Sequence, residues 1–533
     1  MTGVESKLAS HPIPEAEIAI SEPPAEQTFQ QNLLFTAKGG SIAFTGRVFE
    51  YIVRFVFSLI VARIIGAEQY GLYTLALTLI PIASMLALLG LQTGVVAYLA
   101  PAIRERDEQR IWGIIQVCAG IPLLLSVFFG ATLFLLAEPI AILGFHDPRL
   151  VPLLRIASFG IPLEALAFIA YQIIISYKKP QYSVLANNIV LPVTKLLLTI
   201  GLLAIGLRVA GIVTAHVVAS ALGLALIIFF VNSLFALNRP LNPATRNTGQ
   251  LLRYSLPVHL GWVFNTIRGT LEVIVLGFVG LTTGVGIFAV AQRLSSLGTL
   301  PFLSVGNIST PLIADFYNRG ELTQLKNLYQ TTTKWVVMFN LPLFFFFVLF
   351  AIPLLSIFGA DFTFGATALI ILAVGNLFYT GTGFGANILD MTNHTKFNSA
   401  NSALLVVVTI ACDLLFIPRW GVMGAAAASA FSTVIVNLLC LIEVFFLLKM
   451  HPYRRDVFKP IIAVSISALI TYALNQYLVL PPLLHLLIGG VILWGSYAII
   501  LTVLGLSEED IFIFTHFRSR IKSFFSSLRS IAG

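Results

Sequence analysis

The chain repeats apolar runs of about 20 residues along nearly its whole length, with short polar links between them. A helix of that length crosses the roughly 30 Å hydrocarbon core of a bilayer. Charged residues make up 11% of the chain, whereas soluble domains carry about 25%. We therefore predict an all-α, polytopic membrane protein with about fourteen spans. The predicted spans are 36–65, 71–99, 112–137, 151–176, 182–206, 211–237, 255–280, 286–313, 335–357, 364–389, 399–417, 421–448, 458–478 and 483–505.

Lysine and arginine residues are divided unevenly between the two sets of alternate loops, and this division predicts the orientation. The richer set carries Arg104, Arg106, Arg110, Lys178, Lys179, Arg239, Arg246, Arg253, Arg319, Lys326, Lys396, Lys449, Arg454 and Arg455. The other set carries little beyond Arg149, Arg208 and Arg419. Loops rich in lysine and arginine face the cytoplasm. We expect a protein of the cytoplasmic (inner) membrane with both termini in the cytoplasm.

Two short turns indicate an internal duplication. The first and second spans meet at a turn containing Gly71, and the seventh and eighth meet at a turn containing Gly286; an aromatic residue follows each glycine by two positions. Aligning these glycines, with one gap, brings Arg54 into register with Arg268. An even number of spans separates the copies, so the repeats should be parallel. The pattern predicts two six-helix lobes and two further C-terminal helices.

The predicted organisation begins and ends with segments outside the spans. The first segment is rich in proline and glutamate, which is typical of a disordered tail. The last places aromatic and basic residues at helical spacing, which favours an amphipathic helix on the anionic inner leaflet; packing against a neighbouring loop is the alternative. The predicted parts are a cytoplasmic tail (1–30), an N-lobe (31–250), a C-lobe (251–449), two helices (450–506) and an amphipathic tail (507–533).

Three charges lie on one stripe of the first span: Arg47, Glu50 and Arg54. An ion in the hydrocarbon costs from about 3 to over 10 kcal/mol, so such charges persist where the stripe faces a wet cavity. The other candidate cavity residues are Lys195, Arg268, Glu272 and Arg293. Positive charges are in surplus and favour an anionic cargo, because the arginine fork binds phosphate in bidentate fashion. The alternatives are that these residues pair only with each other, and that Arg293 reaches toward the outer surface.

The chain lacks the signatures of catalytic and metal sites. It has no GxxxxGK[ST] phosphate loop, no HExxH pair, no nucleophile elbow and no cysteine–histidine cluster. Cys118, Cys412 and Cys440 are interpreted as small buried hydrophobic residues, and His216 as a packing or polar-contact residue. The aromatic residues lie inside apolar runs, which argues against nucleic-acid binding. We predict no enzyme, no cofactor and no metal.

The segment Ala62–Tyr73 resembles the first periplasmic turn of the polysaccharide transporter family, and Leu89–Gly94 also resembles that family. The family belongs to the multidrug, oligosaccharidyl-lipid and polysaccharide exporter superfamily and includes bacterial O-antigen flippases. The resemblance implies two lobes around a central cavity and movement of undecaprenyl-pyrophosphate-linked oligosaccharide by alternating access. It also implies cationic side chains in the cavity, here Arg47, Arg54 and Arg268. Unlike related lipid II flippases, this chain has no arginine in its second span, which disfavours a peptidoglycan precursor.

Four functions compete on these observations. The leading hypothesis is a flippase for surface polysaccharide biosynthesis, driven by an ion gradient or the membrane potential. The second is a cation-coupled multidrug exporter of the same superfamily, which predicts an acidic cavity. A membrane glycan polymerase or ligase would need a large periplasmic loop, and a non-transporting scaffold would leave the buried charges unexplained. The expected partners are a lipid-linked oligosaccharide, membrane lipids and, as a candidate, a polysaccharide polymerase.

Overall fold

The computed structural model describes residues 25–236, 244, 246, 248–477, 480–505, 507 and 510, with side chains from residue 45 onward except at 260, 265 and 307. Helices and their connecting turns make up these residues, and no strand occurs among them. The all-α prediction is therefore confirmed. The predicted tail at 1–30 lies outside the described residues except for 25–30, which are helical, and the predicted tail helix lies outside them except for Ser507 and Asp510.

The helices follow one another with short connections, and η marks short π or 3-10 helices. The first half forms α1 (Ala25–Leu88), α2 (Leu91–Glu105), α3 (Glu108–Leu135), α4 (Ala137–Pro139), η1 (Ile140–Gly144), α5 (Leu150–Ser158), α6 (Gly160–Ser176), α7 (Pro180–Ser183), η2 (Val184–Val190), α8 (Leu191–Ala204) and α9 (Arg208–Leu234). The second half forms α10 (Thr248–Arg268), α11 (Leu271–Phe278), α12 (Thr282–Ser295), η3 (Ser296–Thr299), α13 (Leu300–Asn318), α14 (Leu322–Ser356), η4 (Ala360–Gly365), α15 (Ala366–Gly381), α16 (Gly385–Met391), α17 (Thr395–Leu448), η5 (Arg455–Val457), α18 (Phe458–Asn475) and α19 (Pro482–Val503).

The long helix α1 is two antiparallel arms joined at Gly66. That residue has φ 78° and ψ 173°, which a helix does not permit and which glycine adopts without a steric penalty. The hydroxyl groups of Ser58 and Tyr70 lie 2.8 Å apart, although twelve residues of straight helix would separate them by about 18 Å. The chain therefore reverses between the first two predicted spans.

A glycine with a non-helical backbone also divides α17 into two arms. Gly421 has φ 54° and ψ −126°, and Asn401 Nδ2 donates to Glu443 Oε2 at 2.5 Å from 42 residues away in sequence. A straight helix would place those two residues about 60 Å apart. The break lies at the predicted boundary between the eleventh and twelfth spans.

The structure confirms a multi-pass membrane protein. Among the described residues, nine helices are long and apolar enough to cross a membrane, or up to eleven if each of two bent pairs counts as one span. One of the nine, α17, folds back on itself and covers two predicted spans. The exact number of spans stays a prediction.

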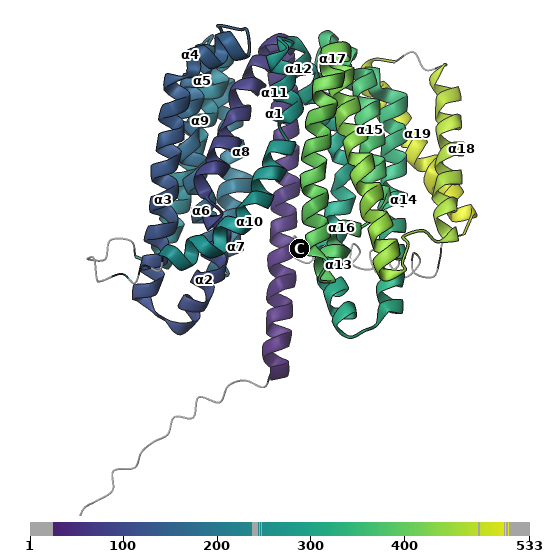
Figure 1. The fold of residues 1–533 in the computed structure, drawn as a ribbon. Helices are drawn as coiled ribbons and strands as arrows, with labels where there is room; N and C mark the ends of the chain where they lie inside the picture. The colour runs from purple at the N-terminus through teal and green to yellow at the C-terminus, as the bar shows by residue number, and fades with distance from the viewer. Residues whose placement is uncertain are drawn as a thin grey trace, which may run out of the picture.

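Two bundles of helices stand side by side, with α1 and α10–α12 between them (Figure 1). Leu91 and Ile169 belong to the hydrophobic core of the first bundle, and Phe384 belongs to that of the second. A larger core joins the bundles and includes Leu72 of α1 and Phe288 of α12. Helix α10 contacts both α2 and α17, so it bridges the two halves. The predicted lobe boundaries stay predictions.

The bundles approach each other closely where α1 crosses α12. A Cβ atom at Gly71 would lie 1.9 Å from the carbonyl oxygen of Thr282, and one at Gly286 would lie 2.0 Å from that of Ala67. Only glycine permits two backbones to come this close. Thr282 and Ala67 each lie four residues before the aligned glycine, so the two contacts are reciprocal, as in an interface with twofold symmetry. This geometry supports the predicted repeat.

The two ends of the molecule differ in packing and charge. We call the end at which Gly71 crosses Gly286 the closed end. The bundles diverge toward the opposite end (Figure 1). That opposite end, here called the basic end, carries Arg104, Arg106, Arg110, Lys178 and Lys179.

Candidate functional site

Two of the three charges on the α1 stripe form an ion pair. Arg54 Nη2 lies 2.6 Å from Glu50 Oε1, one helical turn away, and Glu50 also accepts a hydrogen bond from Asn188 of η2. The Arg54 side chain is 60% exposed, so its guanidinium stays accessible to a ligand. Arg47 is exposed about 10 Å nearer the basic end, with no ion-pair partner among the described residues.

Lys195 of α8 points at the aromatic rings of α1. Its Nζ lies 4.9 Å from the ring centroid of Phe57 and 5.5 Å from that of Tyr73. These distances are within the range of cation–π attraction, which stabilises an ammonium group without neutralising it. The two rings come from opposite arms of the α1 hairpin, so the folding of the hairpin forms the aromatic site that Lys195 contacts.

Arg293 of α12 reaches across to the first half of the chain. Its Nη1 donates to Tyr70 Oη at 3.1 Å, and Tyr70 in turn contacts Ser58. Tyr70 is buried beside the α1–α12 crossing. The Arg293 side chain therefore bridges the two halves of the chain.

The three cations Arg54, Lys195 and Arg293 lie at one depth. Measured along their helices from the closed end, they lie twelve, nine and eleven residues in, which corresponds to about 18, 14 and 16 Å. The midplane of a bilayer core lies about 15 Å below its surface. Lys195 is close enough to the other two to interact with them electrostatically. The structure thus brings positive charge from both halves together near mid-membrane.

A hydrogen-bonded pair inside the first bundle adjoins this cluster. His216 Nε2 of α9 lies 3.1 Å from Glu164 Oε1 of α6, and His216 Nδ1 is buried with no hydrogen-bond partner among the described residues. Glu164 also interacts electrostatically with Lys195. His216 makes the polar contact that the sequence predicts for it.

The second half holds buried carboxylates instead. Glu272 of α11 is 2% exposed and Asp413 of α17 is 0% exposed. Glu272 Oε2 and both carboxylate oxygens of Asp413 find no hydrogen-bond partner among the described residues. The two carboxyl groups are close enough to interact electrostatically. Two buried carboxylates near each other are costly to keep ionised, so this pair is a candidate position for a proton or a cation.

The sequence prediction differs from the structure in two respects in the second half. It places Arg268 and Glu272 one turn apart on one helix, but Gly269 and Thr270 separate α10 from α11; Arg268 is exposed and stays within electrostatic range of Glu272. It also omits Asp413, which lies inside the predicted span 399–417. A carboxylate inside an apolar run is itself a signal of function, and that signal identifies Asp413.

At the closed end, polar contacts outside the hydrocarbon core connect neighbouring segments of the chain. Arg149 Nη2 lies 2.7 Å from Asp147 Oδ2 and 2.8 Å from Glu68 Oε1. The hydrogen bonds from Arg149 hold the pKa of Asp147 below its ordinary value. Arg63 of α1 donates to the carbonyl oxygen of Ile357, just after α14, at 2.8 Å and ties the two halves together.

These features define a multi-pass, all-α membrane protein whose two halves enclose charged groups at mid-membrane depth. Residues 60–363, more than half of the chain, match the family model described as polysaccharide biosynthesis protein. The chain belongs to that family, and the resemblance carried by Ala62–Tyr73 is confirmed.

Curated relatives match part of the chain. An uncharacterized membrane protein of Methanocaldococcus jannaschii is 25% identical over 266 residues, which cover 49% of this chain and 52% of the relative. A probable low-salt glycan biosynthesis flippase of Haloferax volcanii is 23% identical over 198 residues, covering 37% of this chain and 42% of the relative. A second probable flippase of that organism is 25% identical over 188 residues, covering 34% and 39%. The chain therefore spans about half, or less, of the length of these relatives.

Solved structures share the fold over most of the chain. The lipid II flippase MurJ in an inward closed conformation superposes with a TM-score of 0.71 at 16% identity, covering 89% of this chain and 98% of MurJ. An inward-facing multidrug resistance transporter of the MATE family gives a TM-score of 0.62 at 16% identity, covering 77% and 98%. At such identities the likeness establishes the fold alone.

Proposed function

We propose that this protein is a flippase that moves a lipid-linked oligosaccharide across the membrane for surface polysaccharide biosynthesis. The observation that carries the proposal is the meeting of Arg54, Lys195 and Arg293, from both halves of the chain, at mid-membrane depth. Membrane-embedded charges are costly and mark the path of a substrate or ion. The Haloferax relatives, both described as probable flippases, support the same activity.

The anion that these residues would bind is the phosphate linkage between lipid and sugar. Arg54 and Arg293 offer planar forks for phosphate oxygens, and Lys195 adds a point charge. Glu50 would moderate the charge of Arg54, to which it is already paired. Arg47 and Arg268 are exposed and would contact the cargo as it enters or beside the linkage between phosphate and sugar. The finer proposal is an undecaprenyl-pyrophosphate carrier.

Transport would follow alternating access between the two ends. Cargo would enter from the basic end, which we take as the cytoplasmic face of the cell membrane, while the lipid tail stays in the bilayer. Release would require α1 and α12 to part at Gly71 and Gly286, and the bond from Arg63 to Ile357 to break. Rocking of one repeat against the other is the usual way to achieve this. A polysaccharide polymerase at the far face is the candidate recipient.

The energy for transport would enter through Glu272 and Asp413. Both are buried, and three of their four carboxylate oxygens find no hydrogen-bond partner among the described residues. A proton or a monovalent cation bound there would remove the repulsion between the two groups. An ion gradient across the membrane could therefore bias the packing of α11 against α17.

The second candidate is a cation-coupled multidrug exporter, and the carboxylate pair is the observation that favours it. Anionic groups at Glu272 and Asp413 would attract a cationic drug. This function leaves Arg54, Lys195 and Arg293 without a role. A drug exporter should raise drug resistance when overexpressed and should lose that effect in Asp413→Asn but not in Arg54→Gln.

The direct test of the flippase compares two exposed arginines in equivalent pairs. Arg54 pairs with Glu50 and Arg319 pairs with Asp315, each at i, i+4 spacing and with the arginine about equally exposed, at 60% and 62%. In a strain lacking its own copy, Arg54→Gln should lose surface polymer and accumulate complete lipid-linked units accessible only from inside. Arg319→Gln, at the basic end of α13, should export normally. Normal polymer from an Arg54→Gln protein inserted at wild-type levels would refute the proposal.

A further inference from the structure

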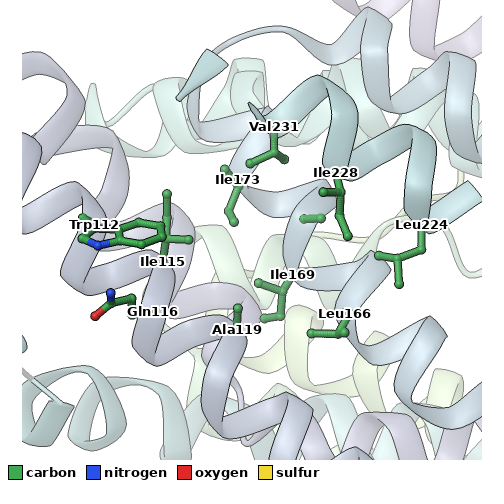
Figure 2. A pocket seen from close by; sticks show the side chains of 11 residues that line it. Trp112, Ile115, Gln116, Ala119, Leu166, Ile169, Ile173, Leu224, Ile228 and Val231 are labelled. Atoms are coloured by element: carbon green, nitrogen blue, oxygen red, sulfur yellow. The ribbon is translucent and has the colours of Figure 1, made fainter. Parts of the chain in front are cut away.

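A cavity of about 270 Å³ lies between α3, α6 and α9 of the first bundle (Figure 2). Its walls come from residues 112–119, 166–173 and 224–231, one stretch from each helix. Each stretch covers about 10 Å of helix, so the cavity runs along the helix axes. It extends from the basic end, where Trp112, Ile173 and Val231 lie, toward the middle of the membrane (Figure 2).

The accessible lining of the cavity is apolar. Its lining consists of aliphatic side chains and Trp112, with Gln116 as the polar exception. Gln116 Oε1 accepts a hydrogen bond from Arg246 Nε at 2.9 Å, and Arg246 is exposed. The indole N–H of Trp112 is buried and has no hydrogen-bond partner among the described residues. A cation that is hydrogen-bonded to a lining residue, Gln116, therefore lies beside an apolar slot.

We propose that this slot binds a phospholipid with an anionic head group. One acyl chain would fill the cavity beside Ile169 and Ile228, and the phosphate would lie against the exposed Arg246. Basic pockets between membrane helices on the cytoplasmic side recognise anionic head groups, and tryptophan favours the membrane interface. The slot opens to the bilayer, because Ile228 in its wall is 42% exposed on a membrane-spanning helix.

The lipid site is separate from the cluster around Arg54. Its walls belong to α3, α6 and α9, whereas Arg54, Lys195 and Arg293 belong to α1, α8 and α12. Its occupant would hold α3, α6 and α9 together without meeting the transported cargo. The proposal therefore does not depend on which cargo the protein moves.

Native mass spectrometry of the purified full-length protein, incubated with equal phosphatidylglycerol and phosphatidylcholine, tests the proposal. The wild type should retain phosphatidylglycerol about fivefold more than phosphatidylcholine, as expected for one well-placed cation. Arg246→Gln should bring the ratio close to one. Arg253→Gln, which removes an exposed charge at the same end outside the cavity lining, should leave the ratio unchanged.

A second pair of variants tests the slot itself. Ile228→Trp narrows the cavity from its half-exposed wall and should lower retention of both lipids. Leu222→Trp, which is 50% exposed on the same helix and outside the lining, should retain them as the wild type does. Equal retention of the two lipids by the wild type, or identical retention in Ile228→Trp and Leu222→Trp, would overturn the proposal.

Discussion

The two halves of the molecule share a helical plan but hold charge in opposite ways. In the first half, Arg54 is paired with Glu50 and Lys195 is stacked on aromatic rings. In the second half, Glu272 and Asp413 are buried carboxyl groups with oxygens that find no hydrogen-bond partner among the described residues. A repeated backbone thus carries different chemistry in each copy. We infer that the cationic cluster, to which the second half contributes Arg293, serves an anionic cargo, and that the carboxylate pair serves a proton or cation.

The largest effect is expected where the second half contributes to the cationic cluster. Arg293→Glu would place an anion beside Tyr70 and repel a phosphate, so the flipping rate in proteoliposomes should fall about 100-fold, from the loss of a charge-assisted contact. Arg319→Glu reverses an exposed charge at the basic end of α13 and should transport at the wild-type rate. An active Arg293→Glu protein would break the assignment of cargo binding to this cluster.

The backbone symmetry of the halves predicts equal damage from two glycine substitutions. Gly71→Ala and Gly286→Ala should each lower stability by about 2 kcal/mol, because the new Cβ meets a carbonyl oxygen in both cases. Thermal unfolding in detergent micelles measures this. Gly120→Ala is the control, since a Cβ there meets nothing within 4 Å. The double variant should lose less than the sum, because both changes separate the same helices. Clearly unequal losses would contradict the repeat.

The carboxylate pair should govern the response to an ion gradient. Asp413→Asn should make flipping independent of the gradient. If one proton is coupled, each pH unit of gradient contributes about a factor of ten to the driving force in the wild type, and the variant should lose that factor. Proteoliposomes with imposed pH or sodium gradients separate the two ions. Asp390→Asn alters a carboxylate that accepts a hydrogen bond from Asn398 at 2.8 Å, and it should keep the gradient response. A gradient response retained in Asp413→Asn would refute ion coupling through the carboxylate pair.

The smallest effect is expected at the closed end, where charge lies outside the membrane. Asp147→Asn should reduce stability at neutral pH by no more than about 1 kcal/mol, the range for partly exposed ion pairs. Arg149 holds the folded-state pKa of Asp147 below its ordinary value of 3.8. The stabilisation is therefore present above pH 3.8 and lost as pH falls through the lowered pKa. Melting temperatures of the two proteins should converge in acid; a difference that persists there would exclude this ion pair as its cause.

Much of the fold follows from local patterns along the chain. Apolar runs predict where helices lie, and the breaks at Gly66 and Gly421 coincide with predicted span boundaries. Glycine alignment also predicts that Gly71 and Gly286 are equivalent positions of a repeat, which their reciprocal contacts support. The cavity residues stay predictions, but the charges themselves are visible without any structure, because a charge in an apolar run stands out in the sequence. The family followed from a short turn motif.

Only the tertiary structure decides which of these charges meet. Arg293 contacts Tyr70 from 223 residues away, and Asp413 lies near Glu272 from a different helix. Helices surrounded by protein on several sides have no clean polar face, so periodicity cannot assign the direction of a side chain. The sequence by itself determined a many-helix membrane protein with charges inside the bilayer. The packing of α1 against α12, and of α11 against α17, decided that those charges form a cationic cluster in one place and a carboxylate pair in another.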